Sequence, residues 1–281
     1  ARSAGSCIAV LPCAGRSPTE QFLTHDLEGL VAIFNTKTHE MYYEVHGKGQ
    51  PALVMGGWGT FCHGQLGPVP RSLLKNYQVI MFDYPGIGVS GDDLSITPSI
   101  SRYATDVAAL LDKLDLGPVH IVGMIGVGAC IGQELAITRP DLVKSLAMAG
   151  TWAKTDHVLH DQVEGLRLAF MRGGFELFQL LAASLSFASE FYNEKRDQLL
   201  GPKGAWSDLQ GRDTAVSRLV DACLSHDSTG QLHKIRCPAF VMHGGRDLFA
   251  GPRFSRFLEK SIPNAIGYDW PDLAHIPSGG D

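Results

Sequence analysis

The chain has 281 residues and is 44% hydrophobic, which is close to the usual share for a globular protein and enough to bury a sizeable core. Its formal net charge of −5 provides no basic footprint for nucleic acid, and it has no uninterrupted apolar run of the roughly 18 residues that suggest a membrane span. The six cysteines include no Cys-x-x-Cys pair, so we expect reduced thiols in a cytoplasmic setting, without a disulfide framework or a metal site.

The first part of the chain predicts an extension followed by strands. Residues 1–27 show no hydrophobic period and are interpreted as an N-terminal extension. Residues 30–34 and 41–45 are rich in apolar, aromatic and β-branched side chains on either side of a short polar stretch, which predicts a β-hairpin. Apolar runs predict the later strands at 52–55, 79–82, 119–123, 143–149, 237–242 and 266–270.

Helical patterns alternate with these strands. Residues 65–75 predict a helix interrupted early by Pro68 and Pro70, and Thr97–Pro98 predicts the start of another that continues to Leu114. Alternating strands and helices indicate a mostly parallel central sheet with helices on both faces.

The alternation stops between residues 153 and 232, where helical patterns occur without a convincing strand. We therefore expect an α/β core formed by residues 28–152 and 233–281, with an all-helical cap inserted at 153–232. A cap over the carboxyl ends of the strands would enclose a pocket where open α/β sheets bind ligands.

The stretch from Val119 to Ala136 carries the most specific signal. An apolar strand passes through Gly123, Gly126 and Gly128 into a helix, which is the strand–turn–helix of a nucleophile elbow, but the expected serine is absent. Counting back from the helix places the nucleophile position at Gly126, whereas counting forward from the strand places it at Ile125; we favour Gly126.

Several motifs in order resemble the α/β-hydrolase superfamily over residues 28–277, and within it the small esterases, enol-lactonases and C–C bond hydrolases with a helical cap. Besides the elbow, they are Met55-Gly-Gly-Trp-Gly59, Asp83-Tyr-Pro-Gly-Ile-Gly-Val-Ser90, His243-Gly-Gly-Arg-Asp247 and Ala274-His275. The order nucleophile, acid, histidine is the order of this fold.

The resemblance implies a catalytic pair of Asp247 and His275, with Gly126 at the nucleophile position. It also implies an oxyanion hole formed by backbone N–H groups of Val127 and of Gly57 or Trp58.

We expect Trp58, Phe170 and Phe178 to contact a small, mostly hydrophobic ester, lactone or polyketide-like substrate. No nucleotide cofactor is expected, because Gly126-Val-Gly128 lacks the full dinucleotide fingerprint. The sequence does not indicate an oligomeric state.

Other reactive side chains are assigned lesser roles. Asp156 is a reserve acid, and Cys130 is interpreted as a buried apolar residue, whereas Cys62 has a small chance of reaching the site. His63 and His243 are interpreted as structural.

Three readings of the function remain open. In the first, the chain is a serine-type hydrolase whose nucleophile has been removed by engineering or lost naturally, or whose nucleophile is a residue other than Gly126. In the second, it is an enzyme that uses only the His275–Asp247 base and an oxyanion hole for lactone or ester hydrolysis, cyclisation, a lyase step or cofactor-free oxygenation. The third reading is a non-catalytic binding protein, because a glycine-only elbow resembles the branch typified by the N-myc downstream-regulated proteins. Fold alone does not choose among them.

Overall fold

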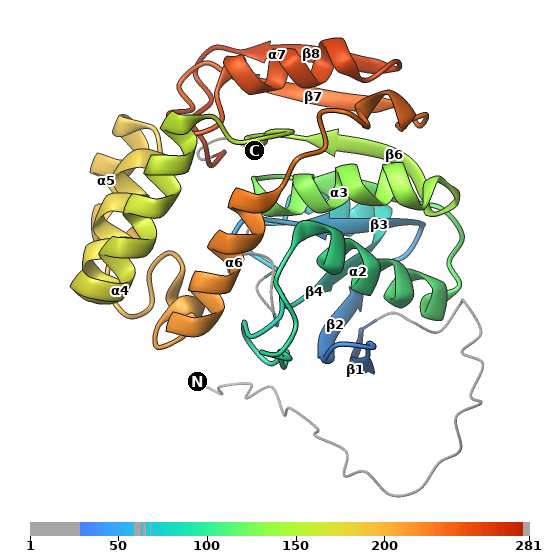
Figure 1. The fold of residues 1–281 in the computed structure, drawn as a ribbon, viewed down its shortest axis with the longest axis horizontal. Helices are drawn as coiled ribbons and strands as arrows, with labels where there is room; N and C mark the ends of the chain where they lie inside the picture. Colours follow the sequence, from blue (N-terminus) through green and yellow to red (C-terminus); the bar gives the residue numbers. More distant parts are fainter. Residues whose placement is uncertain (1–28, 59–62, 64–65, 68, 278–281) are drawn as a thin grey trace, which may run out of the picture.

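In a computed structural model, the structure describes residues 29–58, 63, 66, 67 and 69–277. The predicted extension at residues 1–27 and the candidate Cys62 lie outside the described residues. The chain forms one eight-stranded sheet in the order β1-β2-β4-β3-β5-β6-β7-β8 (Figure 1). The strands are β1 (Leu30–Asn35), β2 (Glu40–His46), β3 (Gln50–Met55), β4 (Tyr77–Phe82), β5 (Val119–Gly123), β6 (Val143–Met148), β7 (Ala239–Gly244) and β8 (Ala265–Trp270).

The sheet is mostly parallel, which confirms the predicted fold class. Strands β1 and β2 form the predicted antiparallel hairpin, with register from Leu30↔Val45 to Asn35↔Glu40, and β2 also pairs antiparallel with β4. Every other neighbouring pair of strands is parallel. The carboxyl ends of β3, β5, β6 and β7 therefore meet at one edge of the sheet.

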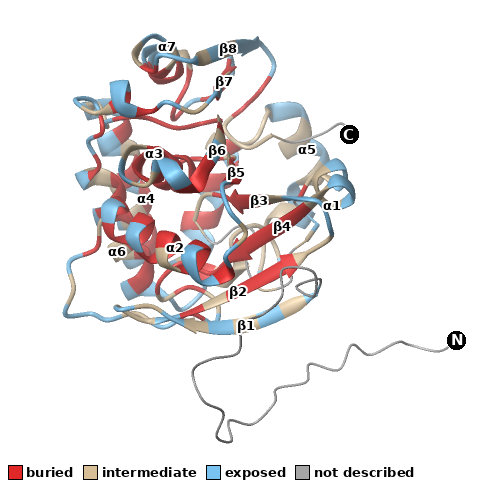
Figure 2. Cartoon of the chain, turned by 90° about the vertical axis from the view of Figure 1, so that its right-hand side faces the viewer, coloured by how far each residue is buried: buried red, intermediate tan, exposed pale blue. Residues whose placement is uncertain are grey.

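Helices cover both faces of the sheet. Helices α2 (Ile100–Leu114) and α3 (Val127–Thr138) lie on one face and α1 (Arg71–Asn76) on the other, while α7 (Pro252–Ser261) packs on β7 and β8 (Figure 2). Each face of the central strands is therefore buried, as their continuous apolar sequences require.

Two helix starts differ from the prediction. Helix α2 begins at Ile100, and its N-cap is Ser99, whose hydroxyl accepts the N–H of Arg102 at 3.1 Å. The Thr97–Pro98 start was therefore wrong, because the side chain that caps the helix lies two residues later.

The predicted helix at 65–75 is also shorter than expected. Among the residues of this stretch that the structure describes, only Arg71–Asn76 is helical, and Pro70 occupies the N-cap. A proline disfavours helical dihedrals at the residue before it and has no N–H to donate, so the helix starts only after Pro70.

Between β6 and β7 the chain forms a helical segment of α4 (His157–Ser186), α5 (Ser189–Leu199) and α6 (Asp213–Ser225), seen at the left and lower centre of Figure 1. Short 3-10 turns at Ser207–Leu209 and Leu232–Lys234 connect α5 to α6 and α6 to β7. This segment stands beside the carboxyl-end edge of the sheet.

Helix α4 is the one helix among the described residues that is long and apolar enough to cross a membrane, by length and composition only. It is interrupted at Gly174, whose φ of 80° and ψ of 176° are not helical. Its inner face supplies Leu159, Leu166 and Phe178 to the pocket described below, so the apolar composition has a packing role.

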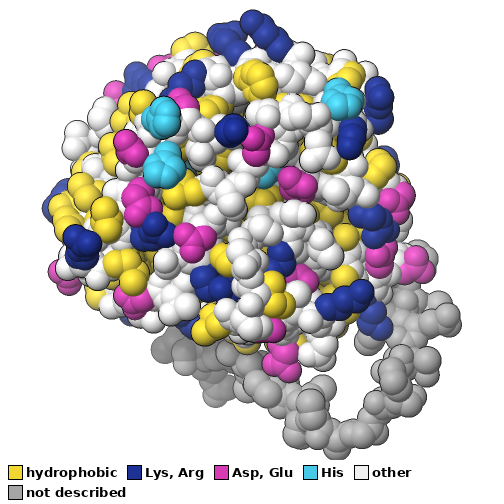
Figure 3. Space-filling view, viewed as in Figure 1, with side chains coloured by type: hydrophobic (Ala, Val, Ile, Leu, Met, Phe, Trp, Pro, Cys, Tyr) yellow, Lys and Arg dark blue, Asp and Glu magenta, His cyan; other side chains and the backbone are white. Residues whose placement is uncertain are grey.

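The main hydrophobic core lies between the sheet and α2 and α3 and continues into the helical segment through Leu159, Phe178 and Leu219. A smaller cluster of Val54, Val79 and Met81 lies under α1 on the other face. On the face seen in Figure 3, acidic and basic side chains are interspersed.

Candidate active site

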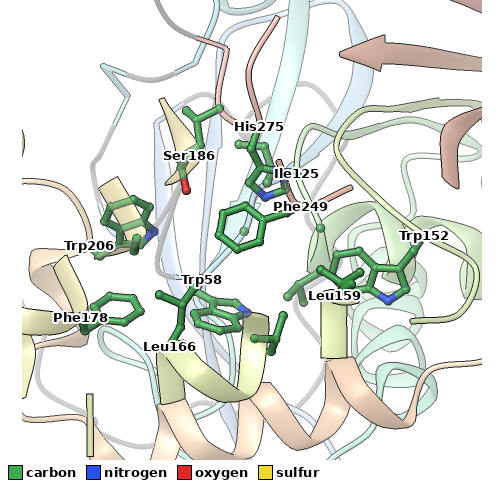
Figure 4. Close-up of a pocket in the computed structure, with 16 residues that line it drawn as sticks. Trp58, Ile125, Trp152, Leu159, Leu166, Phe178, Ser186, Trp206, Phe249 and His275 are labelled. Atoms are coloured by element: carbon green, nitrogen blue, oxygen red, sulfur yellow. The ribbon is translucent and has the colours of Figure 1, made fainter. Parts of the chain in front are cut away.

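One pocket lies between the carboxyl ends of the strands and the helical segment (Figure 4). It contains about 620 Å³ of space not filled by protein atoms, part of it open to solvent. The residues that line it are mostly apolar: Gly57, Trp58, Ile125, Gly126, Val127, Trp152, Leu159, Val163, Leu166, Phe178, Ala182, Ser186, Trp206, Phe249, His275 and Ile276.

The structure brings Asp247 and His275 together at this pocket. His275 Nδ1 lies 3.1 Å from Asp247 Oδ1 and 3.0 Å from Oδ2, and the Asp247 carboxylate is buried. Asp247 Oδ1 also accepts the N–H groups of Phe249 and Ala250, each at 2.8 Å. The carboxylate is thus fixed by its own turn after β7, and a carboxylate at Nδ1 leaves Nε2 as the nitrogen that can accept a proton.

Burial alone would raise the pKa of Asp247, but the neighbouring charge and hydrogen bond of His275 and the N–H groups of Ala250 and Phe249 outweigh it and hold the pKa below its ordinary value. The acid therefore remains ionised at neutral pH. An ionised Asp247 favours the His275 tautomer that carries its proton on Nδ1.

Gly150 permits this close arrangement. Its φ is 50°, and a Cβ at this position would lie 3.1 Å from His275 Nδ1 and 3.4 Å from Asp247 Oδ2. The carbonyl of Gly150 accepts the N–H of Gly126 at 2.9 Å, so the loop after β6 connects the imidazole to the Gly126 turn.

The backbone geometry distinguishes Gly126 from Ile125. Gly126 is the N-cap of α3 and has φ 47° and ψ −108°, a strained conformation between the strand and the helix. Of the residues that the structure describes, a Cβ added to it would meet only Trp152, at 3.5 Å, which is ordinary van der Waals contact. Ile125 lies in the pocket wall, with its Cγ2 near Gly57. The sharp turn is therefore at Gly126.

Two neighbouring glycines permit close packing. A Cβ on Gly123 would lie 2.5 Å from the Cα of Ala129, and one on Gly128 would lie 2.6 Å from the Cβ of Met55. Gly128 also donates its N–H to Gly56 O at 3.1 Å. These contacts hold the turn against the loop after β3.

The three residues predicted to supply backbone amides, Gly57, Trp58 and Val127, line the same pocket. Val127 is the first residue of α3, so its N–H has no partner within the helix. Gly57 and Trp58, in the loop after β3, also line the pocket, and the Trp58 ring stacks on Phe178 with centroids 6.2 Å apart. The His275–Asp247 pair, the sharp turn at Gly126 and these three residues therefore surround one apolar space.

The chain matches the family model described as alpha/beta hydrolase fold over residues 51–278. It belongs to the alpha/beta hydrolase fold family. This hydrolase-fold chain is 29% identical over 237 residues to an Azorhizobium caulinodans protein named as a carbamate hydrolase, RutD, covering 82% of this chain and 87% of the relative. It is also 29% identical over 244 residues to the pimeloyl-[acyl-carrier protein] methyl ester esterase of Chromobacterium violaceum, covering 84% and 91%.

Solved structures share the same alpha/beta hydrolase fold. The enol-lactonase of Burkholderia xenovorans LB400 aligns with a TM-score of 0.72 at 20% identity, covering 85% of this chain and 90% of that chain. MGS-M2, an alpha/beta hydrolase enzyme from a deep-sea metagenome library, aligns with a TM-score of 0.77 at 21% identity, covering 87% and 90%. The names of the two curated relatives support a hydrolase.

The structure separates the two predicted phenylalanines of this alpha/beta hydrolase. Phe178 lines the pocket, whereas Phe170 is absent from the pocket lining. The Phe170 ring packs edge-on against Phe178 with centroids 5.2 Å apart. The expectation that Phe170 contacts the substrate is therefore corrected: Phe170 packs against the outer side of Phe178, which forms the pocket wall.

The reserve candidates have other partners. Asp156 caps α4 through the N–H of Leu159 and pairs with Arg253 at 2.8 Å. Cys130 is fully buried, burial raises the pKa of its thiol, and its Sγ lies 3.4 Å from the hydroxyl of Thr151. Neither Asp156 nor Cys130 is among the residues that line the pocket.

The two other candidate histidines have separate structural partners. His243 Nδ1 lies 2.6 Å from Ser255 Oγ, on α7. His63 Nδ1 lies 3.1 Å from Asp83, and its Nε2 lies 2.8 Å from Asp208 near α6. The hydrogen bond with Asp83 is the largest of the effects that raise the pKa of His63 to about 9, so it is a cation that links the core to the helical segment at neutral pH.

The pocket residues that the sequence analysis did not predict include Trp152, Ser186, Trp206 and Phe249. Trp152 lies in the loop that follows β6 (Val143–Met148), so its place beyond the carboxyl end of a parallel strand could have indicated it. The other three lie at positions that only the packing of the helical segment on the core brings together. Among the described residues, no group of three His, Cys, Asp or Glu side chains could hold a metal ion.

Proposed function

We propose that this protein hydrolyses an ester or lactone bond in a small, mostly hydrophobic substrate, and that water replaces the missing serine as nucleophile. The observation that carries the proposal is the His275–Asp247 pair at 3.0 Å, facing the Gly126 turn inside one apolar pocket. The relatives named as esterase, carbamate hydrolase and lactonase favour acyl chemistry.

In the proposed reaction, His275 Nε2 removes a proton from a water molecule as that water attacks the substrate carbonyl. The N–H groups of Val127 and of Gly57 or Trp58 stabilise the oxyanion that develops. His275 then gives the proton to the leaving oxygen, and Asp247 stabilises the imidazolium throughout. The carbonyl–oxygen bond breaks, and an acid and an alcohol are released.

The missing side chain at Gly126 provides room for that water. Among the described residues other than its chain neighbours, a Cβ there would meet only Trp152, at 3.5 Å, so no other described residue occupies the position of that first side-chain atom. General-base catalysis typically contributes about 10²–10⁴-fold, so we expect measurable but slow turnover.

The helical segment acts as a cap in this proposal. Its residues Leu159, Leu166 and Phe178 close the apolar side of the pocket. A mostly apolar wall favours a hydrophobic acyl or lactone group over a charged one. The cytoplasmic location stays a prediction of the sequence.

The test is hydrolysis of short-chain esters and lactones by the wild-type protein and by the His275→Ala variant. We expect wild-type turnover without a pre-steady-state burst, since no acyl-enzyme forms, and its loss in His275→Ala. Unchanged turnover in His275→Ala would show that another group is the base. A burst in the wild type would show a covalent intermediate and overturn the water mechanism.

The glycine at position 126 also favours a second candidate, in which His275 removes a proton from the substrate itself in a cyclase, lyase or oxygenase type of reaction. Solvent-deuterium exchange into a carbon acid, without ester hydrolysis, would support it. Ligand binding without any turnover, unaffected by His275→Ala, would instead indicate a non-catalytic binding protein.

A further inference from the structure

Ser186 brings a hydroxyl group from the helical segment into a largely apolar pocket. It is the last residue of α4 and is only 3% exposed. Figure 4 shows its oxygen directed into the pocket. Apart from indole N–H groups, Ser186 and His275 supply all the polar side-chain atoms of the described pocket lining.

The Ser186 hydroxyl makes no hydrogen bond to any residue that the structure describes. By contrast, the hydroxyl of Ser184, two residues earlier on α4, donates to Leu181 O at 3.0 Å. The Ser186 oxygen is not enclosed by the described residues, so it is open to the pocket. The Ser186 hydroxyl is therefore expected to bind something that enters the pocket.

The backbone fixes Ser186 on the His275 side of the pocket. Its carbonyl accepts the N–H of Ile276, the residue after His275, at 2.9 Å. A catalytic histidine delivers its proton to the leaving group. The Ser186 hydroxyl therefore lies on the side where the alcohol portion of an ester would leave.

We propose that Ser186 is a specificity residue that donates a hydrogen bond to a second oxygen in the alcohol portion of the substrate. The substrate class is then an ester of an alkoxyalkyl or hydroxyalkyl alcohol with an apolar acyl group. This inference rests on the proposed function for the identity of the leaving side, but the hydrogen bond itself is measurable by binding alone.

Two pairs of esters, each differing by one CH₂ replaced by oxygen, test the inference. Butyl butyrate and 2-methoxyethyl butyrate differ on the alcohol side, and butyl pentanoate and butyl 3-methoxypropanoate differ on the acyl side. We expect Ser186→Ala to reduce the preference for 2-methoxyethyl over butyl butyrate by about three- to tenfold, mainly through KM. The acyl-side pair and the Ser184→Ala control should keep the wild-type ratios.

Stability separates a ligand-binding role from a structural one. Because the Ser186 hydroxyl has no partner among the described residues, Ser186→Ala should not lower Tm. A lower Tm, an unchanged alcohol-side ratio, or an effect confined to the acyl-side pair would each overturn the inference.

Binding distinguishes failure of this inference from failure of the proposed function. Trp58, Trp152 and Trp206 line the pocket, so quenching of tryptophan fluorescence reports occupancy without turnover. If no ester is hydrolysed but Ser186→Ala removes a three- to tenfold Kd preference for 2-methoxyethyl butyrate, the inference stands and the hydrolase proposal fails. If esters are hydrolysed but Ser186→Ala changes neither the KM ratio nor the Kd ratio, the hydrolase proposal stands and the inference fails. If the protein neither binds nor hydrolyses the esters, both the inference and the hydrolase proposal fail.

Discussion

Replacement of Gly126 by serine tests whether this turn holds the nucleophile position. The added Cβ would lie 3.5 Å from Trp152 Cη2 and Cζ3, a distance that needs no movement of the indole ring. The cost comes from the backbone, because φ of 47° and ψ of −108° are strained for any residue with a Cβ. We expect a loss of about 1–3 kcal/mol in the free energy of unfolding.

Gly126→Ala is the matched control, since it has the same backbone strain and no oxygen. Both variants should lose similar stability in urea unfolding. Gly128→Ala should lose more stability than either variant, because its Cβ would lie 2.6 Å from the Cβ of Met55. The comparison separates the chemistry of the hydroxyl from the effect of a side chain at the turn.

The assay combines labelling by a fluorophosphonate probe with hydrolysis of p-nitrophenyl butyrate. Removing the serine of a catalytic triad costs about 10⁶ in kcat in subtilisin, and a site that has not been selected for a serine should recover only part of that factor. We expect Gly126→Ser to exceed Gly126→Ala by at least about 100-fold, which corresponds to about 2.7 kcal/mol of transition-state stabilisation. Labelling should disappear when His275→Ala is added.

A folded Gly126→Ser protein that is neither labelled nor faster than Gly126→Ala would refute this reasoning. It would mean that the turn does not direct a side chain at position 126 toward His275 and the backbone amides. Labelling that persists with His275→Ala would refute the assignment of the base instead.

Three further predictions concern charge. Asp247→Asn should preserve the fold, since its Oδ1 can still accept the two backbone N–H groups, but should lower kcat by about 10²–10⁴ because the His275 tautomer is no longer fixed; unchanged kcat would contradict the pairing. The pKa of His63 is raised from an ordinary value of 6.5 to about 9, so its stabilisation is fully present below pH 6.5 and is lost as pH rises through 9. The difference in Tm between wild type and His63→Gln should therefore shrink from pH 6.5 to 9.5, and a constant difference would disprove the cationic bridge. Asp92→Asn should lower the free energy of unfolding in urea by about 3–5 kcal/mol, because the buried Asp92 carboxylate lies 2.9 Å from Arg102 and 2.6 Å from Arg218. A loss below about 1 kcal/mol would show that these two arginines do not need the Asp92 charge.

The sequence by itself determined the strands, the hairpin and the fold class. These features depend on local patterns: apolar runs of strand length, a polar turn between residues 30–34 and 41–45, and a helix after the glycine turn at 126. The predicted position of a helix start was less accurate where two nearby residues could both act as the N-cap. Ser99 rather than Thr97 caps α2, since both side chains can accept a hydrogen bond and only the packing of the helix selects one.

The pocket walls and the turn at residue 126 were decided by the tertiary structure. Counting along the chain left Ile125 and Gly126 open, and the backbone dihedrals at Gly126 separate them. Ser186, Trp206 and Phe249 come from three separate parts of the chain and meet only because the helical segment folds back over the core. No local sequence pattern predicts that these three residues come together, because their contact depends on long-range packing between elements and not on the local preferences of any one element.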